Sequence, residues 1–282
     1  EMFRRGLEFF VMGLVKKILI ADVIASMADP LWATSDQLQF AGSWLAALGY
    51  TLQIYFDFSA YSDMAVGLGL MLGFTFPQNF NSPYKARNVS DFWRRWHISL
   101  STWFRDYLYI PLGGNRVSLV RNVLIVLFSM SICGFWHGAA WTFVLWGFYH
   151  GLLVAGQHIT NYFFPRFYLP RLISCLLMFL LVALGWVIFR SSSLGDAILI
   201  YQGICNISIG GFVLEFENNT RMVIETIVIL LFGLGLQFFE KASISISLSK
   251  PKVCFTDNFI SGFIFKLGVN FFPICVFKLS IS

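Results

Sequence analysis

Two histidines of this sequence stand where an imidazole could serve as a general base. His137 lies inside Gly134–Trp141, and the flanking stretches Val123–Cys133 and Thr142–Gly147 carry no charge. A titratable side chain at membrane depth costs free energy unless it has a partner or lines a cavity. His97 lies 40 residues before His137. Because a neutral imidazole can take a proton from a hydroxyl near neutral pH, both histidines are candidate catalytic residues.

Each histidine also has a simpler interpretation. His137 taken alone fits a core histidine that is hydrogen-bonded to a neighbour, and His97 fits an interfacial residue on a helix of mixed polarity. His150 follows Tyr149 in an apolar stretch and is interpreted as a hydrogen-bonded, helix-packing histidine. His158 is near a predicted loop, where we expect it to be solvated.

Other polar residues offer weaker signals. Asp57 and Asp63 flank Ser59, Tyr61 and Ser62, and this cluster forms either a polar kink between helices or the lining of a cavity. The segment Gly113–Arg116, which contains Asn115, is either a plain turn or a cradle whose backbone amides hold an anion.

The sequence gives no sign of a metal or of a common hydrolase motif. Its five cysteines are scattered, without a CxxC pair or metal-ligand spacing, which argues against a zinc site or a disulfide framework. It contains no GxSxG, P-loop or HExxH motif. We predict no metal site and no bound cofactor.

The composition is that of a membrane protein. Hydrophobic residues make up 57% of the 282 residues and charged residues only 12%, against about 25% charged in ordinary soluble domains. The mean hydropathy is +0.70. The 18% of aromatic residues suits a bundle with many interfacial rings. We therefore expect an all-α polytopic membrane protein whose partner is the lipid bilayer.

The positive charge is concentrated in one segment. Pro77–Arg121 has seven basic and two acidic residues, a balance equal to the formal net charge of +5 for the whole chain. Such a segment between helices is more typical of a cytoplasmic loop than of a nucleic-acid patch, so we predict no nucleic-acid partner. It could also attract anionic lipid or an anionic co-substrate.

Apolar runs predict the spanning helices, each of which needs about 20 residues. Phe9–Ala25 contains Lys16 and Lys17, so it is an interfacial or re-entrant helix, or a bundle helix whose lysines reach a wet cavity. Phe40–Phe56 and Tyr61–Phe76 are predicted as a pair of helices. Later spans are expected at Val123–Phe135, Trp141–Ala155, Leu172–Phe189, Val223–Phe239 and Phe259–Phe277.

An amphipathic helix is predicted from an N-cap at Ser90 to about Tyr109. Its apolar face carries Phe92, Trp96, Leu100 and Trp103. Such a helix lies along the membrane interface or plugs the bundle.

The positions of charged residues predict the topology. With Pro77–Arg121 in the cytoplasm, His158–Arg171 is inside, Ser191–Arg221 is outside, and Glu240–Asp257 is inside again. This pattern does not settle the path of the first segment.

Five segments in this order resemble the membrane-bound O-acyltransferase family, in particular its bacterial branch that acetylates alginate. They are Gln53–Ala65, Asn81–Tyr84, Asp91–Ser101, Arg105–Gly114 and Gly134–Gly138. The resemblance runs from about Arg4 to Arg190. It implies a ring-like bundle of transmembrane helices, with interfacial and re-entrant helices, around a central tunnel.

The resemblance also implies roles for the two histidines. His137, in the Trp-His-Gly motif, would be the catalytic base, and His97 would be the polar residue beside it. We expect an acyltransferase core at 1–190 and further transmembrane helices at 191–282. Members of the family usually carry additional N-terminal helices, so we expect the chain to be part of a longer protein. Substrate-binding residues are expected at Asp57, Ser59, Trp93, Arg94, Trp96, Trp136 and Asn115.

The function implied is transfer of acetyl from a cytoplasmic donor to hydroxyls of an exported polysaccharide such as alginate, at the bacterial cytoplasmic (inner) membrane. The donor would be acetyl-CoA or another acyl thioester acting as co-substrate. An acyl-carrier protein or periplasmic acetyltransferase proteins would be partners. Two alternatives are D-alanyl transfer toward teichoic acid and a transporter or channel with a histidine-lined path, although the sequence lacks the internal repeat that many transporters show.

Overall fold

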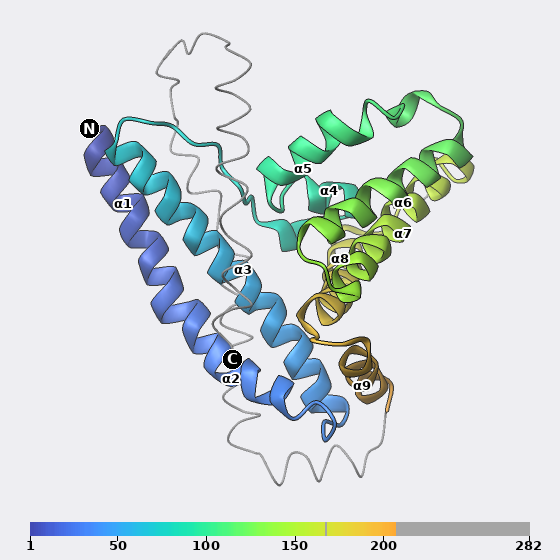
Figure 1. The fold of residues 1–282 in the computed structure, drawn as a ribbon, viewed down its shortest axis with the longest axis horizontal. Helices are drawn as coiled ribbons and strands as arrows, with labels where there is room; N and C mark the ends of the chain where they lie inside the picture. Colours follow the sequence, from blue (N-terminus) through green and yellow to red (C-terminus); the bar gives the residue numbers. More distant parts are fainter. Residues whose placement is uncertain (167, 207–282) are drawn as a thin grey trace.

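Two long helical rods lie side by side at one edge of the molecule (Figure 1). The first consists of α1 (Met2–Val15), a π-helical turn (Lys16–Ala21) and α2 (Asp22–Ala33), and the second is α3 (Phe40–Met71). The computed structural model describes residues 1–166 and 168–206, which contain helices and loops but no strand. The spans predicted at Val223–Phe239 and Phe259–Phe277 and the loop Glu240–Asp257 lie outside the described residues.

The prediction of two helices on either side of Asp57–Ala60 was wrong, because α3 continues through this segment. No proline interrupts it, and both polar side chains are accommodated within the helix packing. Ser59 donates a hydrogen bond to the Phe56 carbonyl one turn earlier, and Asp57 pairs with Lys17 across the interface. A helix keeps its own backbone bonds while such side chains find partners elsewhere.

The segment after α3 contains short helices: a 3-10 turn at Pro83–Lys85, α4 (Val89–Trp93), α5 (Ile98–Phe104) and a π-helical turn at Arg105–Tyr109. The long amphipathic helix predicted here was therefore wrong, since it breaks at His97. That residue adopts a left-handed conformation, with φ 40° and ψ 59°. The predicted apolar face is nevertheless buried at Phe92, Trp96 and Leu100.

The predicted N-cap at Ser90 was also wrong. Asn88 caps α4, because its side chain accepts a hydrogen bond from the Asp91 amide at 2.8 Å. Ser90 lies inside the helix, where its amide and its hydroxyl both donate to Gln157 Oε1 at 3.0 Å. Capping by Asn88 starts α4 two residues earlier than predicted and leaves Ser90 to tie α4 to the neighbouring helix.

The remaining described helices are α6 (Leu119–Trp136), α7 (Trp141–Phe163), α8 (Arg171–Arg190) and α9 (Leu194–Cys205). Helices were predicted correctly at the first three of these positions, with ends that extend further. A 3-10 turn, Gly114–Arg116, precedes α6. Within the described part, α6 and α8 are long and apolar enough to span a membrane, with mean hydropathies of 1.8 and 2.8. The domain division at residue 190 stays a prediction.

The helices α6 and α7 form an antiparallel pair whose backbones touch through glycines (Figure 1). A Cβ atom on Gly147 would lie 2.2 Å from the Met130 carbonyl oxygen, and one on Gly134 would lie 2.1 Å from the Phe143 carbonyl oxygen. Small residues permit this close approach of membrane helices. The turn between the two helices carries His137, so the glycine contact sets the position of that histidine.

We predict that Gly147→Ala destabilises the protein by about 1–3 kcal/mol, since the added methyl group would overlap backbone that cannot move without separating the helices. Gly156→Ala is a matched control on the same helix, because a Cβ there meets nothing within 4 Å. Thermal unfolding in detergent measures both variants. Equal melting temperatures for the two would contradict the close contact.

Candidate functional site

His137 ends α6 and faces an aromatic enclosure. Its ring lies edge-on to Trp136, Trp146 and Phe189, with ring centroids 4.9, 5.1 and 5.3 Å away. Its Nδ1 atom is buried and has no hydrogen-bond partner among the described residues. Buried polar atoms usually have a protein or water partner. This nitrogen is therefore available to a water molecule or a substrate.

His97 is almost fully buried, with 3% of its surface exposed. Its ring lies edge-on to Phe58 of α3, with centroids 4.7 Å apart. His97 and His137 lie close enough for an electrostatic interaction between their imidazoles. The structure thus brings near each other two histidines that are 40 residues apart in the sequence, one just before α5 and the other just after α6.

The unusual backbone at His97 is held from outside its own helices. The Asn79 carbonyl accepts the Ile98 amide at 2.9 Å, and the Asn79 side-chain oxygen accepts the Ser99 amide at 3.1 Å and the Ser99 hydroxyl at 2.7 Å. The Asn81 amide donates to the Arg95 carbonyl at 2.9 Å. These bonds clamp the chain on both sides of His97.

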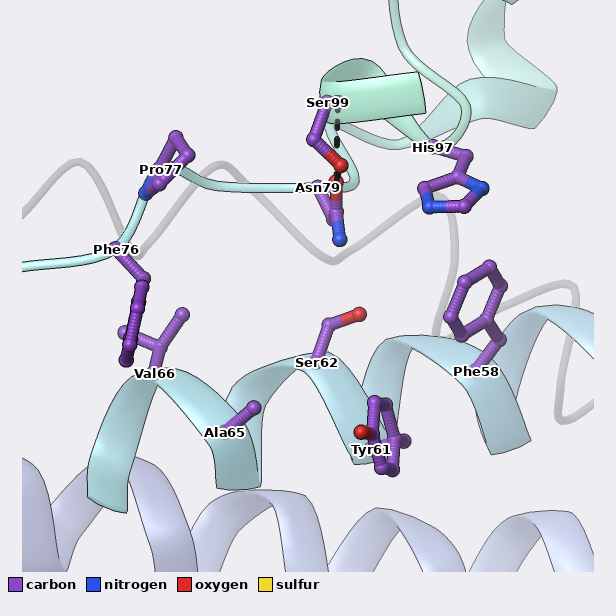
Figure 2. Close-up of a pocket in the computed structure, with 10 residues that line it drawn as sticks. All are labelled: Phe58, Tyr61, Ser62, Ala65, Val66, Phe76, Pro77, Asn79, His97 and Ser99. Atoms are coloured by element: carbon purple, nitrogen blue, oxygen red, sulfur yellow. Dashed lines mark hydrogen bonds between the residues drawn. The ribbon is translucent and has the colours of Figure 1, made fainter. Parts of the chain in front are cut away.

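A cavity of about 140 Å³ lies beside His97, between α3 and the segment 76–79 (Figure 2). Its polar lining includes His97, Ser62, Asn79 and Ser99. The rest of the lining is mostly apolar and comes from Phe58, Tyr61, Ala65, Val66, Phe76 and Pro77. A concave, mainly apolar space with a few convergent polar groups is the usual form of a small-molecule site.

Of the three tryptophans predicted to bind substrate, one lies against His137, and none lines the cavity. Trp136 contacts His137 directly. Trp93 is edge-on to Trp146, and its indole nitrogen is buried without a partner in the described part of the chain. Trp96 is 4% exposed and packs in the aromatic core.

The other predicted binding residues do not line the cavity. Asp57 is engaged with Lys17, and Ser59 is bonded to its own helix. Arg94 is exposed on α4. Asn115 is exposed and accepts a hydrogen bond from the Tyr109 hydroxyl at 2.6 Å. A binding role for these four residues stays a prediction that the geometry does not support.

Asn79, which sequence analysis missed, lines the cavity. It is a common residue type without a motif of its own, so the sequence offered little signal. The polar cluster between Asp57 and Asp63 lines the cavity through Tyr61 and Ser62, which is one of the two alternatives that the sequence left open.

The remaining two histidines have structural surroundings. His150 is fully buried and stacks on Phe92, with ring centroids 6.0 Å apart, which confirms the packing position. The hydrogen bond expected for it was wrong, since neither of its nitrogens has a partner among the described residues. The solvated position predicted for His158 was wrong, since it is half-buried and its Nδ1 lies 2.6 Å from Asn122 Oδ1. Asn122 also donates to the Gly114 carbonyl, which makes the glycine segment a hydrogen-bonded turn.

The lysines of the first rod pair with carboxylates. Lys16 lies 2.8 Å from Asp63, and Lys17 lies 2.7 Å from both Asp57 and Asp22. The π-helical turn contains both lysines. Pairing within the bundle explains how these charges are tolerated in an apolar run.

We predict that Lys17→Met destabilises the protein, because it leaves the mostly buried Asp57 carboxylate without this cation. Lys17 is itself 38% exposed, so we expect a loss below that of a fully buried pair, roughly 1–3 kcal/mol. Adding Asp57→Leu to Lys17→Met should recover most of the loss. A double-mutant cycle on melting temperature checks this, and additive losses would show that the pair is not coupled.

Among the described residues, no group of three or more His, Cys, Asp or Glu side chains is placed to hold a metal ion. The three cysteines in this part, Cys133, Cys175 and Cys205, are free thiols.

The described part of the chain is helical and contains two helices of membrane length, and comparison with known families gives its class. The chain belongs to the membrane-bound O-acyltransferase (MBOAT) family, whose profile matches residues 1–193. Proteins of this family are polytopic membrane proteins, and both histidines and the cavity fall within the matched region.

Curated relatives give more specific names. A probable alginate O-acetylase of Azotobacter vinelandii is 45% identical over 234 residues, which cover 83% of this chain and 46% of that protein. A probable alginate O-acetylase of Pseudomonas aeruginosa is 43% identical over 250 residues, which cover 86% of this chain and 47% of that protein. A peptidoglycan O-acetyltransferase of Helicobacter pylori is 43% identical over 240 residues, which cover 79% of this chain and 44% of that protein. The chain spans about half the length of these relatives.

Proposed function

We propose that this chain is the catalytic part of an O-acetyltransferase that moves acetyl from a cytoplasmic acyl thioester to hydroxyls of an exported polysaccharide. The observation that carries the proposal is that His97, which lines the cavity, lies within electrostatic range of His137. Membership of the MBOAT family and the similarity to two probable alginate O-acetylases support it.

The chemistry follows from the two imidazoles. His137 accepts the proton of the acceptor hydroxyl while that oxygen bonds to the thioester carbonyl carbon, and a tetrahedral intermediate forms. The intermediate collapses, the carbon–sulfur bond breaks, and the thiolate takes the proton back from His137. His97 holds the reacting groups or relays the proton. General-base catalysis of this kind contributes about 10²–10⁴-fold.

The aromatic enclosure keeps water away from this reaction. Trp136, Trp146 and Phe189 surround His137, so the thioester meets the sugar hydroxyl in place of bulk water. We propose that the two substrates reach the histidines through a tunnel within a ring of helices, from opposite faces of the bacterial inner membrane.

The exposed basic residues of the segment 77–121 suit an anionic donor. Arg94, Arg105, Arg116 and Arg121 are all exposed. Their charge would attract the phosphates of acetyl-CoA or the acidic surface of an acyl-carrier protein. Periplasmic acetyltransferase proteins are the partners we propose on the opposite face.

Peptidoglycan is a second candidate for the acceptor of the acetyl group. The relative from Helicobacter pylori is named a peptidoglycan O-acetyltransferase at nearly the same identity as the alginate relatives. Cells with and without the gene, grown with labelled acetate, decide between the two. Label lost from exported polysaccharide supports the first acceptor, label lost from peptidoglycan supports the second, and label unchanged in both contradicts acetyl transfer.

We predict that His137→Ala abolishes acetyl transfer while the full-length protein still accumulates in membranes, because the imidazole supplies the base and its ring makes no described hydrogen bond through Nδ1. The measurement is the amount of labelled acetyl on the acceptor relative to membrane protein. Near wild-type transfer by this variant would remove His137 from the mechanism.

His158→Ala serves as the comparison for the loss of an imidazole. This histidine lies toward the C-terminal end of α7, whereas His137 precedes that helix, and its Nδ1 contacts Asn122 Oδ1. We expect its transfer rate to stay near that of the unchanged protein.

A further inference from the structure

The cavity beside His97 contains two hydrogen-bond donors that no neighbour in the described chain uses. Ser62 is 7% exposed, and its hydroxyl oxygen is buried without a partner there. Figure 2 shows this hydroxyl directed into the cavity from α3. The Ser62 hydroxyl makes no hydrogen bond within the described part of the chain, so it is available to a ligand.

Asn79 supplies the second donor from the opposite wall. Its side-chain oxygen is occupied by the Ser99 amide and hydroxyl. That bonding fixes the orientation of the carboxamide, and Figure 2 shows its nitrogen directed away from Ser99 into the space above Ser62. An asparagine amide nitrogen has two hydrogens to donate and cannot accept.

These donors converge on one region from two rigid supports. Ser62 is within a helix of 32 residues, and Asn79 is anchored by three hydrogen bonds to the residues that follow His97. Preorganised neutral donors in a water-poor site are the arrangement that stabilises a developing oxyanion. A site for a stable anion would gain more from a cation, and the lining contains no lysine or arginine.

We propose that the Asn79 amide nitrogen and the Ser62 hydroxyl form the oxyanion site of the acyl transfer. This inference rests on the proposed function. As the acceptor oxygen bonds to the thioester carbon, the carbonyl π electrons move to the carbonyl oxygen, which the two donors hold. When the carbonyl re-forms, the electron pair returns and the carbon–sulfur bond breaks, releasing the thiol and the O-acyl product.

The volume of the cavity agrees with an oxyanion site for a small acyl group. The cavity has a volume of about 140 Å³, and about 10–15 Å³ in this measure is enough for one water molecule. The cavity is therefore large enough for the acetyl end of a thioester, next to the imidazole of His97. Its apolar walls, which include Phe76 and Val66, suit the methyl group and the sulfur.

Asn79→Asp is the sharpest test, since aspartate keeps an oxygen for the Ser99 amide and replaces the donating nitrogen with an acceptor. Ser62→Ala removes the other donor. We expect kcat to fall about 10²–10³-fold for each variant, the range found for loss of one oxyanion donor, with the KM for the thioester nearly unchanged. The assay uses the full-length protein in membranes with acetyl-CoA and, separately, an acetylated carrier protein.

Two matched controls accompany these variants. Asn81→Asp makes the same chemical change two residues away, at an exposed side chain outside the cavity lining. Ser129→Ala removes another buried hydroxyl without a described partner, on α6. Both should transfer acetyl at the rate of the unchanged protein.

A thioether analogue of the donor, with a methylene group in place of the carbonyl, separates the oxyanion role from simple binding. It lacks the oxygen that the donors would hold, so it should inhibit the unchanged protein and Ser62→Ala equally. Weaker inhibition of Ser62→Ala would indicate a ground-state contact and overturn the inference. Should Asn79→Asp fail to accumulate in membranes, Ser62→Ala decides alone.

Failure of this inference differs from failure of the proposed function. If the unchanged protein transfers acetyl and His137→Ala does not, the function holds. Full kcat in both Asn79→Asp and Ser62→Ala would then overturn the oxyanion site alone. Absence of transfer by the unchanged protein from either thioester would overturn the function and the inference with it.

Discussion

The left-handed backbone at His97 is the constraint on which the arrangement of the site depends. A residue with a Cβ atom pays about 1–2 kcal/mol for this conformation, and no neighbouring glycine relieves the cost. The hydrogen bonds from Asn79 and Asn81 to both sides of His97 offset it. With φ at 40°, the chain turns sharply between α4 and α5. That turn places the imidazole against Phe58 of α3 instead of along the apolar face that Phe92 and Trp96 share.

The second histidine is positioned by a different kind of contact. His137 follows α6 directly, and α6 meets α7 with its backbone in contact at Gly134 and Gly147. The two helices can slide little along each other, because a side chain brought to either glycine position would collide with a backbone carbonyl of the other helix. Trp146, next to Gly147, is thereby fixed edge-on to His137. One histidine is thus set by hydrogen bonds and the other by glycine packing, and the aromatic core joins the two supports.

The sequence predicted the local features and missed those that depend on distant partners. Apolar runs predicted α6, α7 and α8, and the isolated histidines predicted His97 and His137 as site residues. The break at His97 could not be predicted, since the residues Asp91–Tyr109 have a helical pattern and the hydrogen bonds that hold the break involve Asn79 and Asn81, outside this segment. The continuity of α3 through Asp57 likewise depends on Lys17, which belongs to another rod. Asn79 and Ser62 carry no motif, so only their common orientation toward the cavity reveals them.

The distribution of charge around α3 explains why neutral donors suit the cavity. The carboxylates Asp57 and Asp63 face the lysines of the first rod, where ion pairs satisfy them. Ser62 and Phe58, on the same helix, face His97 across the cavity. Placing the charges on one side of α3 and neutral dipoles on the other keeps a permanent charge out of the space where a transient oxyanion forms. A lysine there would hold a stable anion through the whole cycle, whereas an amide and a hydroxyl bind most strongly when the carbonyl oxygen becomes negative.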